Sequence, residues 1–165
     1  MAYDRIDWHS GGDYPKGLPH ENGGTHIGMF LAWAINRNLE GELHHDSERE
    51  EQALKSVRDR TITGRDFLIN QCDEKFWDED LNEEGNNFAK WYYEPNKEGH
   101  PTYFEDYCHA LEDGSDKSAY HYENNWENYD KVAAILDRRF DEWKRGVIPE
   151  RLAKPGKSKP WWKLW

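Results

Sequence analysis

Apolar residues recur at helical spacing along much of the chain, and this pattern predicts a mainly α protein. In the stretch 25–35 they fall on one face of a helix that begins at Thr25 and ends within 38–41. The clearest helix covers 124–145, where aromatic and aliphatic residues recur every three or four positions. We expect this helix to cross the whole domain.

Shorter helices are predicted from cap signals as well as from spacing. Ser47 and Glu50 have the arrangement of a capping box. Further helices are predicted at 47–58, from Thr63 onward, at 87–94 and at 103–111. Residues 1–24 are rich in Gly, Pro, Asp and His, which predicts an irregular N-terminal arm that wraps the body.

The composition supports one helical core built largely from aromatic side chains. Leu, Ile, Val and Phe number only 27 of 165 residues, a low content that is usually typical of disorder in a highly charged chain. Nine Trp and nine Tyr supply the missing apolar volume. Val, Ile and Thr number only 14, which argues against an all-β protein. The predicted fold is therefore a single compact helical domain.

Charge divides the chain into an acidic body and a basic tail. The whole chain has a net charge of −11, yet residues 144–165 carry +6 and residues 1–143 carry −17. We expect an acidic helical domain at 1–146 and a basic, Trp-rich tail at 147–165. The acidic body excludes nonspecific nucleic-acid binding by that part of the chain. The tail is expected to fold back onto the acidic body, with partner binding as the alternative.

The sequence favours a cytoplasmic protein with reduced thiols. The first residues are charged and lack the apolar core of a signal peptide, and no apolar stretch approaches the roughly 20 residues of a membrane span. Cys72 and Cys108 form no CxxC motif, and their apolar neighbours predict buried structural thiols.

Long sequence strings carry a family resemblance over most of residues 3–143. They are YDRIDWH (3–9) with GGD (11–13), GTHIGMFLAWAI (24–35), DEDLNEEGN (78–86) with FAKWYY (88–93), and WENYD (126–130) with LDRRFDEW (136–143). They resemble a family of small bacterial proteins of unknown function. Such proteins look like the small stand-alone partners found beside bacterial toxins, so the resemblance implies an immunity protein that binds and occludes a cognate toxin.

The acidic centre of the chain is the predicted partner-binding face. Residues 73–84 hold seven acids and one base, interrupted by Phe76 and Trp77. Carboxylates steer a basic partner and aromatic side chains anchor it, whereas the plainer interpretation is a solvated acidic surface. The residues assigned to this face are Asp73, Glu74, Trp77, Asp78, Glu79, Asp80, Glu83 and Glu84. No catalytic residue, cofactor or metal is predicted, since no serine elbow and no metal-type spacing occurs.

Two other functions remain open from the sequence. A metal- or ligand-binding enzyme would use the Gly-, His- and Asp-rich N-terminal region, with His9, Asp13 and His26 assembled in three dimensions. His44 and His45 are adjacent, which is unsuitable for a shared metal on a helix, and are expected in a surface loop. A structural or regulatory subunit of a bacterial complex would instead be anchored through the Trp161–Trp165 tail.

Overall fold

The computed structural model describes residues 1–94 and 100–152, and within them the chain is mainly α, as predicted. The helices are α1 (Ile6–His9), α2 (Thr25–Asn36), α3 (Glu48–Arg58), α4 (Gly64–Gln71), α5 (Glu83–Tyr92), α6 (Tyr103–Leu111) and α7 (Trp126–Lys144). The strands are β1 (Ala2–Arg5) and β2 (Lys75–Trp77), which pair antiparallel. Short 3₁₀ turns cover His20–Gly24, Glu42–His45, Asp78–Asp80 and Ala119–His121.

Side-chain caps fix where several helices begin. The Ser47 side chain accepts the backbone N–H of Glu50, and Thr63 forms a reciprocal capping box with Asp66, so both predicted starts are confirmed. The helix expected at 87–94 begins earlier, at Glu83, because the Asn82 side chain accepts the N–H of Gly85. The first turn of α5 is polar and shows no apolar periodicity, so the sequence pattern did not indicate that the helix begins there.

Helix α2 is the centre of the core. The sequence predicted one buried face, but every residue from Thr25 to Ile35 is buried. Other elements therefore cover this helix on all sides. The closest approach is to α4, where Gly28 and Gly64 leave no room for a side chain: a Cβ on Gly28 would lie 2.3 Å from the backbone nitrogen of Arg65.

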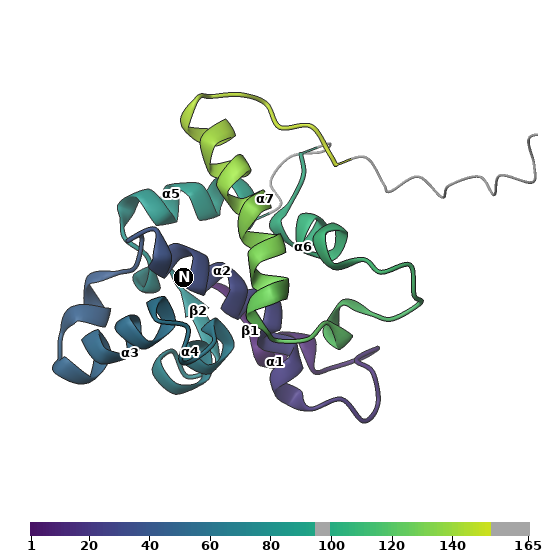
Figure 1. The fold of residues 1–165 in the computed structure, drawn as a ribbon, viewed down its shortest axis with the longest axis horizontal. Helices are drawn as coiled ribbons and strands as arrows, with labels where there is room; N and C mark the ends of the chain where they lie inside the picture. Colours follow the sequence, from purple (N-terminus) through teal and green to yellow (C-terminus); the bar gives the residue numbers. More distant parts are fainter. Residues whose placement is uncertain (95–99, 153–165) are drawn as a thin grey trace, which may run out of the picture.

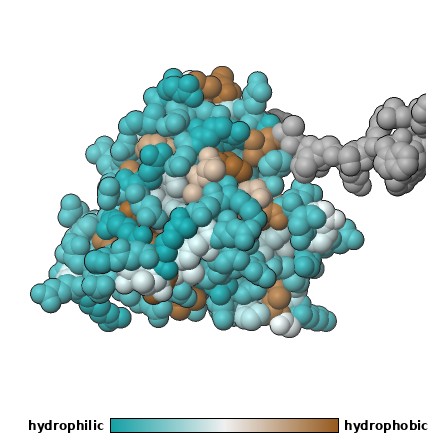
Figure 2. All heavy atoms as spheres, in the orientation of Figure 1, coloured by the Kyte–Doolittle hydropathy of each residue, from teal (hydrophilic) through white to brown (hydrophobic). Residues whose placement is uncertain are grey.

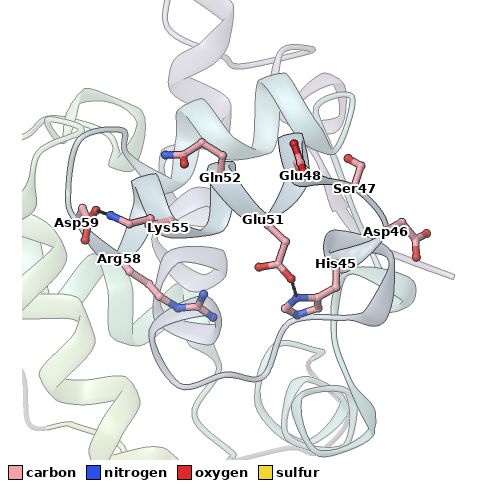
Figure 3. Close-up of a pocket in the computed structure, with 9 residues that line it drawn as sticks. All are labelled: His45, Asp46, Ser47, Glu48, Glu51, Gln52, Lys55, Arg58 and Asp59. Carbon is pink, nitrogen blue, oxygen red and sulfur yellow. Dashed lines mark hydrogen bonds and ion pairs between the residues drawn. The ribbon is translucent and has the colours of Figure 1, made fainter.

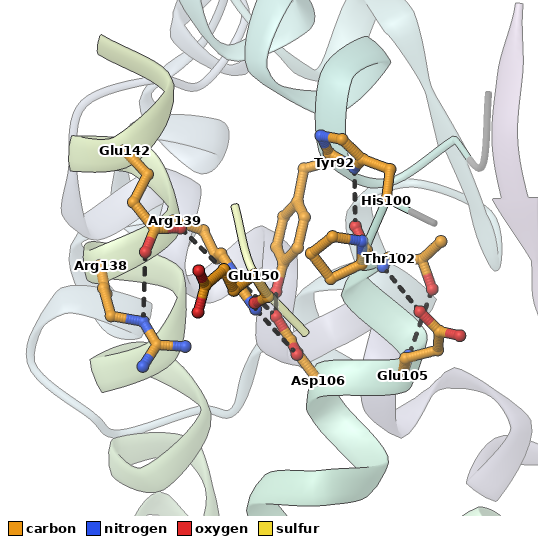
Figure 4. Close-up of polar contacts among 10 residues, drawn as sticks. Tyr92, His100, Thr102, Glu105, Asp106, Arg138, Arg139, Glu142 and Glu150 are labelled. Atoms are coloured by element: carbon orange, nitrogen blue, oxygen red, sulfur yellow. Dashed lines mark hydrogen bonds and ion pairs between the residues drawn. The ribbon is translucent and has the colours of Figure 1, made fainter. Parts of the chain in front are cut away.

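Helix α7 crosses the molecule as expected, with α6 on one side and α3, α4 and α5 on the other (Figure 1). Its apolar stripe contacts the core, with Val132 and Leu136 fully buried. The same helix also buries the guanidinium of Arg139, which donates to Asp106 on α6 at 2.7 Å and to Glu142 at 2.8 Å (Figure 4). Tyr92 of α5 donates to the same Asp106 carboxylate at 2.6 Å, so one buried acid joins three helices.

The N-terminal arm is more ordered than its composition indicates. Its first residues form β1, which pairs with β2 across more than 70 residues of sequence. Helix α1 and the turn His20–Gly24 follow and pack on each other. The strand was missed because its partner β2 has only three residues and lies in the acidic segment, where no alternating pattern is visible.

The surface is mostly hydrophilic, with scattered apolar patches on the face shown in Figure 2. Among the described residues, no helix is long and apolar enough to cross a membrane. Helix α7 ends at Lys144, close to the expected end of the acidic domain. The Trp161–Trp165 segment lies outside the described residues, so the role of the tail stays a prediction.

Replacing Gly28 by Ala is expected to destabilise the protein by about 2 kcal/mol or more, because the added methyl group collides with the α4 backbone. Urea unfolding of the variant and the wild type measures this difference. Gly11→Ala is the matched control, since a Cβ there meets nothing within 4 Å. An unchanged midpoint for Gly28→Ala would contradict the close packing of α2 on α4.

Candidate functional site

Four of the predicted acidic residues gather at one surface region, which we call the acidic face: Asp78, Glu79, Glu83 and Glu84. The turn Asp78–Asp80 supplies the first two, and the first turn of α5 supplies the others. Two adjoining hollows lie along this face. Asp78, Glu79, Glu83 and the basic Lys90 line one, Glu83 and Glu84 line the other, and both hollows also include Asn87.

Aromatic residues flank the acidic face without being fully exposed. Trp77 directly precedes the turn and is half-buried in β2. Trp143 of α7 is also half-buried and lines the hollow beside Glu84. Lys144, the next residue, forms an ion pair with Glu84. The region therefore combines carboxylates with partly exposed indole rings.

Asp73 and Glu74 lie apart from the hollows, in the turn between α4 and β2. Both adopt a left-handed backbone conformation, with φ of 50° and 61°. Asp73 pairs with Lys75, and the hydrogen bond from that lysine lowers the pKa of the Asp73 carboxyl. Glu74 pairs with His20 at 3.1 Å. The structure thus divides the acidic run into two surface groups at opposite ends of β2.

Asp80 is buried and does not contribute to the acidic face. Its Oδ2 accepts the backbone N–H of Trp77 at 2.6 Å, and its Oδ1 lies 3.1 Å from Nε2 of His44. Cys72 completes this inner group, and burial followed by the Asp80 charge raises the pKa of its thiol well above the usual value. The three-residue turn directs Asp78 and Glu79 outward and Asp80 inward.

The adjacent residues His44 and His45 are likewise divided between the interior and the surface. His44 is 1% exposed, so the expectation of a surface loop is wrong for this residue. The Nδ1 atom of His44 is buried without a hydrogen-bond partner. His45 is exposed as expected, and it pairs with Glu51 at 2.8 Å beside the charged hollow along α3 (Figure 3). Ion pairs lie across that hollow, and its charged side chains do not point toward a common centre where a ligand could bind.

The structure brings His9 and His26 together, and Asp4 rather than the expected Asp13 lies beside them. Asp13 is exposed in the arm and is not in this group. Asp4 comes from β1, His9 from the end of α1 and His26 from the first turn of α2. We call Asp4, His9 and His26 the Asp4 cluster. The sequence could not show Asp4 because strand β1 was not recognised.

The Asp4 carboxylate accepts four hydrogen bonds. His9 Nε2 lies 2.7 Å from Oδ1 and His26 Nε2 lies 3.1 Å from Oδ2. The hydroxyl of Tyr93 donates to Oδ2 at 2.7 Å, and the backbone N–H of Arg5 donates to Oδ1 at 2.8 Å. An ionised carboxylate only accepts, so both imidazoles present Nε2–H toward it.

Burial and hydrogen bonding set the charges in this cluster. Burial alone raises the pKa of Asp4, but hydrogen bonds from His26 and His9 outweigh it and hold that pKa well below the usual value. Burial lowers the pKa of His26, which favours its neutral form. The other nitrogen of His9, Nδ1, lies 3.0 Å from the hydroxyl of Tyr120, which donates to it in this tautomer.

The cysteines are both free thiols. Cys72 is buried, as predicted, whereas Cys108 is only half-buried on α6. Burial still raises the pKa of the Cys108 thiol to about 11, so it is protonated at neutral pH. Neither thiol is therefore an activated nucleophile.

Comparison with known proteins identifies one family. A family model described as a domain of unknown function, DUF7832, matches residues 2–122. This range contains both the acidic face and the Asp4 cluster. No curated protein and no solved structure matches the chain.

Replacing Asp4 by Asn is expected to cost about 3 kcal/mol of unfolding free energy, because a neutral amide cannot accept from all four donors and leaves buried groups unsatisfied. Chemical unfolding measures the loss. Asp13→Asn provides the control, since this exposed side chain lies outside the cluster. Equal stability of the two variants would show that the buried hydrogen bonds of Asp4 do not stabilise the fold.

Proposed function

We propose that this chain, which belongs to the DUF7832 family, a domain of unknown function, is an immunity protein. It binds a cognate bacterial toxin in the cytoplasm and occludes a basic active-site cleft of that toxin. The protein itself performs no chemistry in this role. Its activity is the blocking of access to the toxin's substrate.

The observation that supports this function is the gathering of Asp78, Glu79, Glu83 and Glu84 around two adjoining hollows. The hollows are shallow and open to solvent, so their carboxylates are accessible to basic side chains of a partner. The net charge of −17 over residues 1–143 adds long-range attraction to a basic surface. Such attraction raises the rate of encounter and disfavours acidic partners.

Slow release requires buried contacts in addition to charge. Trp77 and Trp143 are half-buried beside the acidic face, so each has apolar surface left to cover. Aromatic side chains at the centre of an interface commonly account for most of its binding energy. In the proposed complex the carboxylates accelerate association, and the two indoles slow dissociation.

The two surface groups of acids have different parts in this proposal. Asp73 and Glu74, at the far end of β2, extend the negative surface but do not line the hollows. Asp80 supports the turn from inside. We therefore assign direct contact with the toxin to the acidic face and to the flanking tryptophans.

Reversing the charge of Glu79, Glu83 and Glu84 to Lys is expected to slow association with the toxin by about tenfold or more. A tagged protein first captures its partner from the native host, and the purified partner is then used for association kinetics at low and high salt. The wild type loses association rate as salt rises, whereas the variant shows little salt dependence. The partner is expected to be toxic alone and harmless when co-expressed with this protein.

The matched control reverses three exposed glutamates outside the acidic face, Glu48, Glu112 and Glu127. It changes the net charge by the same amount, and Glu48 and Glu127 lie in first turns of helices as Glu83 and Glu84 do. Circular dichroism melts confirm that both variants fold. The assignment of the surface fails if the two triple variants associate equally fast. The immunity function itself fails if the captured partner is not toxic.

A further inference from the structure

The Asp4 cluster has the donor types of a metal site. Two imidazole nitrogens and a carboxylate converge from three elements, β1, α1 and α2. We propose that the Asp4 cluster binds one divalent transition-metal ion of the zinc class, with a carboxylate oxygen of Asp4 and the Nε2 atoms of His9 and His26 as ligands. This site is independent of the proposed toxin-binding function.

The donor atoms are already close to the spacing that such an ion requires. One atom from each residue lies within 4.8 Å of the other two. In a tetrahedral site with bonds of about 2.0–2.1 Å, ligand atoms are about 3.3 Å apart. His9 Nε2 lies 2.7 Å from Oδ1 of Asp4 and His26 Nε2 lies 3.1 Å from Oδ2, so both imidazoles already face the carboxylate that would share the ion.

The groups that hydrogen-bond to His9 and Asp4 from outside the cluster are of the kind found around the ligands of metal sites. A ligating imidazole commonly bonds a partner through its other nitrogen, and His9 Nδ1 has the Tyr120 hydroxyl. A ligating carboxylate is in turn hydrogen-bonded, and Asp4 has Tyr93 and the backbone of Arg5. These contacts hold His9 and Asp4 in orientation whether or not the ion is bound.

Binding also requires a proton shift within each imidazole. The hydrogen bonds to Asp4 place an N–H at Nε2 of each ring, so the proton must move to Nδ1 for the Nε2 lone pair to face the ion. In His9 the new Nδ1–H then donates to the Tyr120 oxygen, which reverses that hydrogen bond without breaking it.

The cluster is also partly open, as a site with a free coordination position requires. The side chain of His9 is 20% exposed, whereas those of Asp4 and His26 are 11% and 3% exposed. Three protein ligands leave a fourth position for water or a small ligand. We place that position on the side of His9, where solvent can enter.

A second group, His44, Cys72 and Asp80, is the natural competitor among the described residues. It is more deeply buried, since the side chains of His44 and Asp80 are 1% and 5% exposed. A metal there would have a thiolate ligand, and this difference separates the two groups experimentally.

Cobalt(II) is the probe, added to the full chain after treatment with a chelator. We expect one Co²⁺ per chain, with visible ligand-field bands of a nitrogen- and oxygen-ligated ion and no thiolate-to-cobalt charge-transfer band. Cys72→Ser is expected to leave the spectrum and the affinity unchanged. Zinc is expected to displace the cobalt and bleach the bands.

Two variants separate the metal ligand from the structural hydrogen bond. His9→Gln keeps an N–H donor for Asp4 but removes the imidazole, so we expect cobalt affinity to fall at least about 100-fold with little change in unfolding midpoint. Tyr120→Phe keeps all three ligands and removes only the contact with Nδ1 of His9, so we expect a loss of about 10–100-fold.

Three results would overturn the site. The first is absence of cobalt binding by the folded wild type at millimolar metal. The second is a thiolate charge-transfer band that Cys72→Ser abolishes, which would place the ion at the competing group. The third is unchanged affinity in folded His9→Gln. None of these results bears on capture of a toxin, so the two proposals are tested separately.

Discussion

Burial of helix α2 on every side is the constraint on which the rest of the structure depends. A helix without a solvent-facing side must be covered by several elements at once, and these elements are then fixed relative to one another. Helix α4 approaches through the contact of Gly28 with Gly64. Around Phe30 the covering is aromatic, with rings from β2, α5 and α6 within 6.2 Å. In this way a chain poor in aliphatic residues still closes a dense core.

The cost of burying carboxylates decides the rest of the arrangement. Within residues 1–94 and 100–152, four acids, Asp4, Glu40, Asp80 and Asp106, are buried, although the chain has a large acidic excess. Each is tolerated because donors from distant elements meet it: His9 and His26 for Asp4, Arg58 for Glu40, His44 for Asp80 and Arg139 for Asp106. These contacts fasten β1, the turn Asp78–Asp80 and α6 to the core. They also determine which acids remain on the surface for a partner.

Helix α5 connects the two functional proposals. Its first turn presents Glu83 and Glu84 to the acidic face, and Tyr93, just beyond its last turn, holds the Asp4 carboxylate. A helix of 10 residues spans about 15 Å, so one rigid element positions both regions. The acidic face acts through exposed charge and needs little internal order. The Asp4 cluster depends on the relative positions of side chains from three elements, which the packed core around α2 fixes.

Local signals in the sequence determined the helical class, most helix positions and the acidic composition of the surface. Helical periodicity and caps such as Ser47 and Thr63 act over a few residues, so they are visible without a fold. Which charges are buried was decided only by the tertiary structure. Asp80 lies within an acidic run yet points inward, and Asp4 replaces the expected Asp13 beside His9 and His26. The physical reason is that a buried charge is stabilised by donors far away in sequence, and those donors come together only when β1 pairs with β2 and both pack on α2.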